Sequence, residues 1–285
     1  MNKSYFKKIC IGTAQFGNKY GISNKNRKTS ALEAKKIIKL AKSKKINYFD
    51  TAESYGNSHK ILGKCKLKNH NIITKIYLKK YLDINSTIDK FLKDLKIKKL
   101  YAILIHNPKI LLSKDGIDLF DELTRLKSKG LIKKIGVSEY SVARLQKIIN
   151  SYQLDIVSFP FNPFDNRLVA SGLLKRLKKN NIEIHARSIF LQGLLLMDIS
   201  KLPRKLRKWN NVLSTFENLS NKSSASRLKL CLDYVLSVKE IDKITLGVEN
   251  HNQLKEILIN MSNKVKKREI NFKYIPSLSN PLMWL

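Results

Sequence analysis

The stretch that decides the fold is NYFDTAESYG, residues 47–56, in which a short apolar run ends in a carboxylate and a phenol follows it. The segments NIITK, residues 71–75, and YAILIHNP, residues 101–108, share this form: a β-prone run followed by a polar side chain. Such short runs, rich in β-branched and aromatic residues, are typical of buried parallel strands. The polar side chains that follow the three runs are Asp50, Tyr55, Lys75 and His106. Because parallel strands end at the same edge, we expect these side chains to lie close together.

Strands and helices alternate along the rest of the chain. The segments that predict strands are 9–12, 46–50, 71–75, 100–106, 132–137, 156–159, 182–187 and 244–247. The segments with helical periodicity between them include 31–44, 87–95, 117–129, 143–150, 169–179 and 225–238. Strands that alternate with helices in a chain of 285 residues predict an α/β fold, a single-domain (β/α)8 TIM barrel.

Two segments of this domain lie outside the regular alternation of strands and helices. We expect the domain to span residues 1–285, with a tail from about 262 to 285 that folds over the barrel mouth. Residues 197–221 are the longest insertion between a strand and a helix, and they predict a loop or short helix near the rim of the site.

The four strand-end side chains form one coherent set for protonating a carbonyl oxygen. A free tyrosine has a pKa near ~10, and a lysine ammonium beside it favours the phenolate and lowers that pKa. A carboxylate keeps such a lysine protonated, and a histidine hydrogen-bonds the substrate oxygen and fixes its position. The sequence therefore predicts Tyr55 as general acid, with its pKa tuned by Lys75 and Asp50. His106 is predicted to orient the carbonyl group.

Each of these residues also has a purely structural interpretation. Any single lysine in so lysine-rich a chain is a surface residue by default. Asp50 suits an ordinary strand-end or capping residue, Tyr55 suits a turn with an aromatic lid, and His106 suits a loop. The order and spacing favour the catalytic interpretation, because all of them fall just past successive predicted strands.

The same residues carry a resemblance to the aldo/keto reductase superfamily. Its pattern is an Asp-x4-Tyr motif, a strand-end Lys, and a strand-end His before a proline-containing loop, all present here in that order. Further matching phrases are IGTAQFGNKYG, GLIKKIGVSEYS, FPFNPFDNRL, RSIFLQGLLL and GVENHNQLKEI. The resemblance covers the chain roughly from Ile9 to its end. It implies an NAD(P)H-dependent oxidoreductase that reduces an aldehyde or ketone to an alcohol, with a sugar-derived carbonyl or a simple aldehyde as substrate.

Hydride chemistry requires a cofactor, because no side chain can supply a hydride. No G-x-G-x-x-G follows the first predicted strand, and barrels usually bind phosphates at the loops after the seventh and eighth strands. By resemblance, the residues that bind the dinucleotide are Thr13, Asp50, Ser138, Ser158, Arg187, Ser188, Phe190, Gly193, Gly247, Val248 and Gln253. Arg187 stands where the family puts a flat side chain against the nicotinamide. The expected cofactor is NADPH, with NADH left open because Gly247 and Gln253 stand where many NADPH-using members carry Lys and Arg.

Other positions depart from the family pattern or concern the substrate. Ser138 is followed by Glu139 in place of the usual Asn, and Ser158 replaces a glutamine, so two contacts to the nicotinamide carboxamide are altered. Phe16 in the first loop and Tyr77 past the third predicted strand are candidates for the substrate-pocket wall.

Charge and cysteine content limit the remaining function classes. Lys plus Arg number 56 against 22 Asp plus Glu, a formal charge of +34, but the lysines are spread along every predicted helix. The chain is also heavy in Asn and Ile, so codon bias explains much of this excess, and we expect no nucleic-acid partner. The widely spaced cysteines Cys10, Cys65 and Cys231 predict no metal site. No apolar run approaches the ~20 residues that span a bilayer, so we expect a cytoplasmic protein with no membrane partner. The oligomeric state is not indicated.

Other functions stay open from the sequence alone. One is a non-catalytic barrel that binds a nucleotide as a sensor or partner subunit, although such a protein has no need to keep Tyr55 and Lys75 together. A basic nucleic-acid-binding protein on a barrel scaffold is another. A lyase or isomerase that uses the same acid–base set without net redox chemistry is the last.

Overall fold

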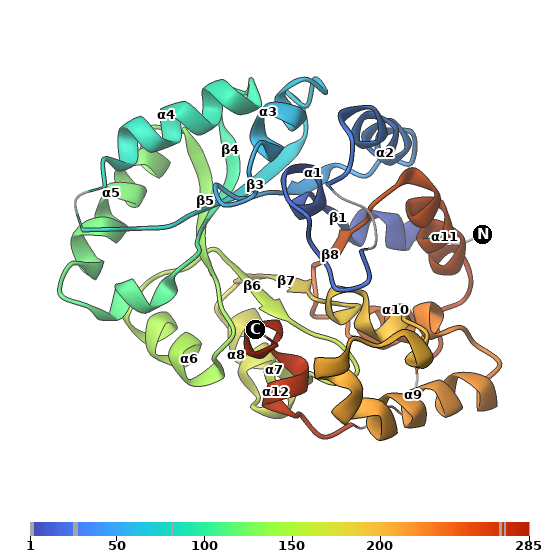
Figure 1. Ribbon diagram of the computed structural model, residues 1–285. Helices are drawn as coiled ribbons and strands as arrows, with labels where there is room; N and C mark the ends of the chain where they lie inside the picture. Colours follow the sequence, from blue (N-terminus) through green and yellow to red (C-terminus); the bar gives the residue numbers. More distant parts are fainter. Residues whose placement is uncertain (1–2, 25–27, 81, 268–269, 271, 285) are drawn as a thin grey trace.

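The computed structural model describes residues 3–24, 28–80, 82–267, 270 and 272–284. Eight parallel strands form a closed barrel in the order β1 to β8 (Figure 1). The strands are β1 (Ile9–Gly12), β2 (Tyr48–Asp50), β3 (Asn71–Ile76), β4 (Leu100–Ile105), β5 (Ile132–Ser138), β6 (Ile156–Pro160), β7 (Glu183–Arg187) and β8 (Lys243–Gly247). Each strand overlaps one of the predicted strand segments, so the predicted (β/α)8 TIM barrel is confirmed.

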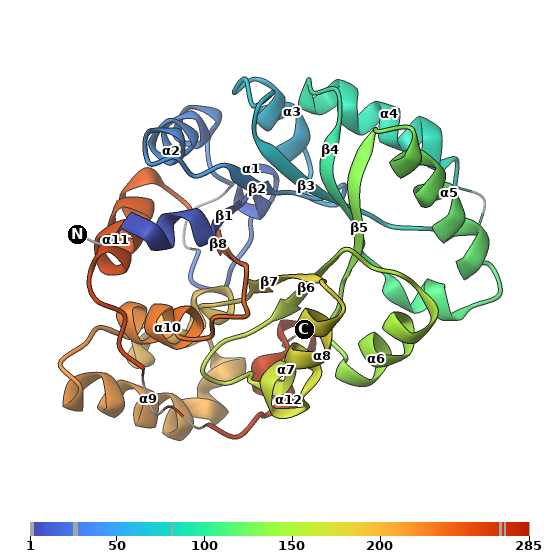
Figure 2. The ribbon, with the colours of Figure 1, turned by 180° about the vertical axis from the view of Figure 1, so that it is seen from behind.

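Helices surround the barrel, as the views from both sides show (Figures 1 and 2). The α-helices are α1 (Ala14–Gly17), α2 (Ala31–Ser43), α3 (Ser58–Gly63), α4 (Ile84–Leu95), α5 (Gly116–Ser128), α6 (Val142–Ser151), α7 (Arg167–Ala170), α8 (Leu173–Lys179), α9 (Asn210–Lys222), α10 (Arg227–Leu236), α11 (His251–Ser262) and α12 (Pro276–Ser279). Short 3-10 helices are formed by Lys3–Lys8, Pro108–Leu112, Leu191–Leu196, Ile199–Lys201, Arg204–Trp209 and Pro281–Met283. Because helices cover the outer face of the sheet, the strands are buried on both sides, which explains their continuous apolar runs.

Helix α2 shows how the local sequence determines these elements. The Ser30 hydroxyl accepts a hydrogen bond from the Glu33 N–H at 3.2 Å and so caps the first turn. The buried residues of the helix are Ala34, Ile37, Ile38 and Ala41. Their helical spacing forms one apolar stripe, which faces the core.

Two segments differ from the sequence-based expectation. The predicted helix 169–179 is divided into α7 and α8, because Gly172 between them has φ +71, outside the helical region. The expected loop or short helix at 197–221 instead contains α9, a helix of 13 residues. Asn and Ser are weak helix formers, so the sequence of α9 gives little local signal. The helix is stabilised by tertiary packing, which buries Leu213 and Phe216.

The barrel interior is a packed core. A separate cluster of buried residues fills it: Cys10, Ile73, Ala102, Leu104 and Ile156. At the amino end of the strands, Glu183 accepts a hydrogen bond from the Tyr101 hydroxyl at 2.6 Å and contacts His185 Nε2 at 2.6 Å. Space for a ligand therefore lies at the carboxyl ends of the strands, the usual position in this architecture.

The described part of the C-terminal tail packs on the loop after β6. The ring centroids of Phe272 and Phe164 are 4.4 Å apart, and the Ser279 hydroxyl donates a hydrogen bond to Phe164 O at 2.8 Å. These contacts hold the tail near the carboxyl edge of the barrel. None of the described tail residues lines the cavity that follows, and the closure of the tail over the mouth stays a prediction.

Two findings on the described part of the chain concern partner classes. None of its helices is both long and apolar enough to cross a membrane. Its His, Cys, Asp and Glu side chains form no group of three or more that is placed to hold a metal ion.

Candidate active site

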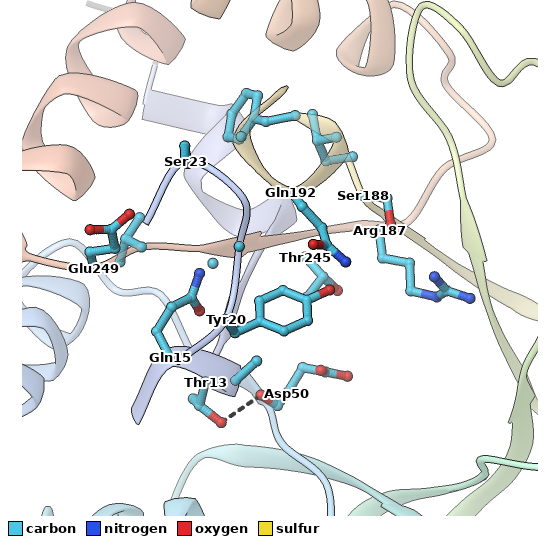
Figure 3. Close-up of a pocket in the computed structure, with 18 of the residues that line it drawn as sticks. Thr13, Gln15, Tyr20, Ser23, Asp50, Arg187, Ser188, Gln192, Thr245 and Glu249 are labelled. Carbon is cyan, nitrogen blue, oxygen red and sulfur yellow. Dashed lines mark hydrogen bonds between the residues drawn. The ribbon is translucent and has the colours of Figure 1, made fainter. Parts of the chain in front are cut away.

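A cavity of about 780 Å³ opens at the carboxyl ends of the strands (Figure 3). Residues at or just past the ends of β1, β2, β3, β4, β5, β7 and β8 form its wall, together with the first turns of α10 and α11. The predicted catalytic residues Asp50, Tyr55, Lys75 and His106 all line this cavity. The structure therefore brings the four side chains together, as the positions of the predicted strands led us to expect.

Asp50 and Lys75 form a buried ion pair at the ends of β2 and β3. Lys75 Nζ donates hydrogen bonds to Asp50 Oδ1 at 2.5 Å and to Thr51 O at 2.9 Å. The two side chains are only 8% and 2% exposed. The strand register explains the pair, because Asp50 lies opposite Ile73, and Lys75 is two residues further along the same face of β3.

Tyr55 lies beside this ion pair, in the loop after β2. Lys75 Nζ is 4.9 Å from the centroid of the Tyr55 ring. The ring of His106, just past the end of β4, lies 6.5 Å from the Tyr55 ring at an angle of 85°. The loop is positioned by packing on Gly17, where a Cβ atom would stand 1.6 Å from Tyr55 O. Only glycine permits this approach. The ammonium, the phenol and the imidazole therefore face one part of the cavity.

Burial and neighbouring charges determine the protonation of these groups. Burial raises the pKa of Tyr55, and the Lys75 ammonium offsets only part of this shift. The sequence predicted a lowered pKa for Tyr55, and this direction is wrong because desolvation outweighs the ammonium. Burial opposes the charged form of Lys75, but Asp50 and Tyr55 outweigh it and raise the pKa of Lys75. Burial, followed by the charges of Lys75 and Arg187, lowers the pKa of His106 to about 4. At neutral pH the site therefore holds a neutral phenol, an ammonium and a neutral imidazole.

The residues predicted to bind a dinucleotide line the same cavity, with one exception. Those in its wall are Thr13, Asp50, Ser138, Arg187, Ser188, Phe190, Gly193, Gly247, Val248 and Gln253. Ser158 is buried within β6 and does not line the cavity. The residues predicted for the substrate wall also lie elsewhere. Phe16 is fully buried in the hydrophobic core, and Tyr77 is 53% exposed and absent from the cavity wall.

The loop after β7 meets the loop after β1 across the cavity. Positive φ angles occur at Ser188, Leu191, Gln192 and Gly193. Such backbone strain is often found in functional loops. The Ile22 N–H donates a hydrogen bond to Gln192 O at 3.1 Å, and a Cβ on Gly193 would stand 1.9 Å from Ser23 Oγ. The close approach of these two loops therefore requires glycine at position 193.

Several residues of the cavity wall are not predicted from the sequence. They include Gln15, Tyr20, Tyr140, Arg227, Glu249 and Glu256. The ring of Tyr20 reaches toward the middle of the cavity (Figure 3). Tyr20 and Tyr140 are aromatic residues in polar loops that follow predicted strands. This position could have indicated that both side chains line the cavity. Glu249 lies in the polar loop before α11, and Glu256 lies within that helix. No local sequence pattern there shows which side chains enter the cavity.

Glu139, which departs from the family pattern, has a structural role here. Its side chain is 1% exposed and pairs with Arg144, whose Nε lies 2.5 Å from Glu139 Oε2. The backbone N–H groups of Tyr140 and Ser141 donate hydrogen bonds to Glu139 Oε1 at 2.6 and 2.8 Å. The carboxylate therefore organises the turn between β5 and α6 and is absent from the cavity wall.

The chemistry of the wall fits an elongated polar ligand such as a nicotinamide dinucleotide. Three buried polar atoms of the wall have no hydrogen-bond partner among the described residues: Gln15 Oε1, Arg187 Nε and Thr245 Oγ1. The N-termini of α10 and α11 also face the cavity, and a helix N-terminus favours phosphate groups. An amide, a hydroxyl and helix N-termini match the amide, hydroxyl and phosphate groups of such a cofactor.

Comparisons with known proteins agree with this geometry. A sequence model of the aldo/keto reductase family matches residues 8–276. None of the curated protein sequences matches the chain. An aldo-keto reductase from Bacillus halodurans has a similar structure, with a TM-score of 0.71 and 16% identity over 91% of this chain and 88% of that chain.

Two further solved structures are similar to the same extent. A glycerol dehydrogenase from Gluconobacter oxydans gives a TM-score of 0.69 and 20% identity, over 90% of this chain and 86% of that chain. A thermostable aldo-keto reductase in complex with the inhibitor epalrestat gives a TM-score of 0.67 and 22% identity, over 91% of both chains. At these identities the structural likeness establishes the fold alone.

Proposed function

The chain belongs to the aldo/keto reductase family, and on that premise we propose that it is an NAD(P)H-dependent oxidoreductase that reduces an aldehyde or ketone to an alcohol. Tyr55 is the proposed general acid, tuned by Lys75 and Asp50. His106 is the residue proposed to orient the carbonyl. The observation that carries this proposal is the buried contact of Lys75 with Asp50 on one side and Tyr55 on the other.

The proton is supplied by Tyr55. Because burial raises its pKa, the phenol is protonated before the reaction and remains a donor at neutral pH. As the Tyr55 proton passes to the substrate oxygen, the Lys75 ammonium stabilises the phenolate that forms. Asp50 keeps Lys75 charged during this step. A bound nicotinamide dinucleotide supplies the hydride that the carbonyl carbon requires.

His106 positions the carbonyl oxygen. Since its pKa is lowered to about 4, the imidazole is neutral at neutral pH and binds the oxygen through one hydrogen bond without transferring its own proton. The oxygen is then held between the Tyr55 hydroxyl and His106, whose rings are nearly perpendicular.

The position of Tyr55 also defines how a dinucleotide would lie. If its nicotinamide meets the carbonyl beside Tyr55, residues at the end of β8 and the start of α11 would hold the adenosine half. The resemblance favours NADPH as the hydride donor. The carboxylates of Glu249 and Glu256 line that part of the wall and oppose a 2′-phosphate, so parallel titrations with NADPH and NADH decide between the two.

The substrate class follows from the family and stays broad. An aldehyde or a ketone meets the requirements of the site, and a sugar-derived carbonyl is the narrower proposal.

A Tyr55→Phe variant tests the proposed function. We expect carbonyl reduction to fall roughly 100-fold or more, because the proton donor is lost. Dinucleotide affinity, measured by intrinsic fluorescence, should remain within about twofold. Tyr152→Phe is the matched control, because its hydroxyl bonds Leu111 O at 2.6 Å in a part of the chain that does not line the cavity. Wild-type turnover in Tyr55→Phe contradicts the mechanism, and dinucleotide binding by a wild-type protein that reduces no carbonyl favours the non-catalytic alternative.

A further inference from the structure

Arg187 is a cation in the cavity wall whose hydrogen-bonding capacity is not filled. It ends β7, and its side chain extends to the opposite side of the cavity from Glu249 (Figure 3). Its guanidinium carbon lies 3.9 Å from the centroid of the Tyr140 ring. Nη2 donates a hydrogen bond to Glu139 O at 3.0 Å. The buried Nε atom has no partner among the described residues.

The carboxylates near Arg187 are bound to other arginines. Glu139 pairs with Arg144 at 2.5 Å, and Asp165 pairs with Arg167 at 2.7 Å. Within the described part of the chain, no carboxylate forms a salt bridge with Arg187. The other cation at this end of the cavity, Lys75, is neutralised by Asp50. Arg187 therefore gives this end of the cavity its net positive charge.

The charge of Arg187 acts on the groups that hold the carbonyl oxygen. It is among the causes that lower the pKa of His106, and it acts in the same direction on the pKa of Tyr55. Arg187 is thus electrostatically coupled to the catalytic end of the cavity. An unpaired, partly buried charge is unfavourable, and a guanidinium edge binds carboxylate and phosphate groups with directional hydrogen bonds.

We propose that Arg187 binds an anionic group of the carbonyl substrate, so that preferred substrates carry a carboxylate or phosphate as well as the C=O group. This inference rests on the proposed reductase function and narrows its substrate class. One face of the guanidinium is covered by Tyr140, and the buried Nε, which has no partner among the described residues, is the donor left to pair with the anion. The pyrophosphate of the dinucleotide is the other source of such an anion, and the experiment distinguishes the two.

The test compares substrates that differ by one charged group. The pairs are 4-oxobutanoate with methyl 4-oxobutanoate, and glyceraldehyde 3-phosphate with glyceraldehyde. In the wild type, kcat/KM for the charged member of at least one pair should exceed that of the uncharged member roughly 10- to 100-fold, the value of a hydrogen bond to a charged group. In Arg187→Gln this ratio should fall toward one, whatever the absolute rates. Arg125→Gln removes a surface charge that is 65% exposed and should keep the wild-type ratio.

The possible results separate the inference from the proposed function. Equal kcat/KM within both pairs in the wild type overturns the inference and leaves the reductase function intact. A preference that persists in Arg187→Gln overturns it as well, and if that variant also binds the dinucleotide more weakly, Arg187 serves the pyrophosphate. If the wild type reduces none of these compounds with either dinucleotide, the proposed function fails first.

Two measurements remain decisive if Arg187→Gln does not fold. Arg187→Lys keeps the charge but loses the planar donor edge, so it should retain only part of the preference. In the wild type, succinate should inhibit reduction of methyl 4-oxobutanoate, whereas uncharged succinamide should not. Equal inhibition by both compounds contradicts the inference.

Discussion

Replacement of Lys75 by methionine tests the central ion pair through both stability and activity. Lys75 is 2% exposed, and its ammonium bonds Asp50 at 2.5 Å and Thr51 O at 2.9 Å. Methionine has a similar length but no charge, so it leaves the Asp50 carboxylate buried without its cation. Removing one partner of a buried ion pair destabilises a protein by about 3–5 kcal/mol. We therefore expect Lys75→Met to lose a large part of the about 5–15 kcal/mol typical of a folded domain.

A second substitution separates the ion pair from its catalytic role. In Asp50→Asn/Lys75→Met the buried charge is also removed, so the free energy of unfolding should return to within about 2 kcal/mol of the wild type. Carbonyl reduction should stay roughly 100-fold or more below the wild type in both variants, because nothing stabilises the Tyr55 phenolate. Lys36→Met is the control, since Lys36 is 49% exposed and contacts Glu33 at 3.5 Å. Loss of such a surface pair changes stability by less than about 1 kcal/mol.

The assay is equilibrium urea unfolding at neutral pH, followed by tryptophan fluorescence, with initial rates of reduction measured on the same samples. A loss in Lys75→Met no greater than that in Lys36→Met refutes the energetic argument. A double variant no more stable than Lys75→Met shows that the unpaired carboxylate is not the source of the loss. Full turnover in Lys75→Met refutes the assigned mechanism.

Three further predictions concern the rest of the cavity. Because its pKa is lowered to about 4, His106 should stay neutral between pH 7 and pH 5. An NMR titration in which the His106 imidazole has a pKa of about 6 or more contradicts this prediction. Gly193 has φ +89 and lies against Ser23, so Gly193→Ala should weaken dinucleotide binding and destabilise the fold. Gly130 has φ +76 but lies in open space, so Gly130→Ala should cost only the backbone strain, about 1 kcal/mol, and destabilise the fold less. Glu249→Lys should improve NADPH binding relative to NADH roughly tenfold, since the 2′-phosphate then meets a cation. An unchanged ratio of the two dissociation constants places the 2′-position elsewhere.

The sequence predicts the barrel well because buried parallel strands have a strong local signature. The apolar runs of β2, β3 and β4 end abruptly in polar residues, so the carboxyl ends of these strands are marked. Once the strands are placed, the topology requires Asp50, Lys75 and His106 to lie at the same edge. The clustering of these side chains with Tyr55 in one cavity was therefore predictable from spacing, although the electrostatics of the cluster were not.

What the sequence could not predict depends on contacts between distant segments. The raised pKa of Tyr55 results from desolvation by the assembled cavity, which has no counterpart in the local motif. Tyr20 reaches the cavity because its loop meets Gln192 and Gly193, which are far from it in the sequence. Helix α9 follows the same rule, since its Asn- and Ser-rich sequence becomes helical through the burial of Phe216.

The distribution of charge shows why overall composition says little about the ligand. The chain has 56 basic and 22 acidic residues, yet the described cavity wall carries equal numbers of Lys or Arg and Asp or Glu side chains: Lys75, Arg187 and Arg227 against Asp50, Glu249 and Glu256. The basic excess therefore lies outside the cavity, and the ligand is selected by where each charge stands. Lys75 and Asp50 neutralise each other, so the end of the cavity beside Tyr55 keeps the charge of Arg187, whereas Glu249 and Glu256 stand on the β8–α11 segment. The substrate proposed above, an aldehyde or ketone that also carries a carboxylate or phosphate, suits this placement, because its anion would meet Arg187 beside the carbonyl group.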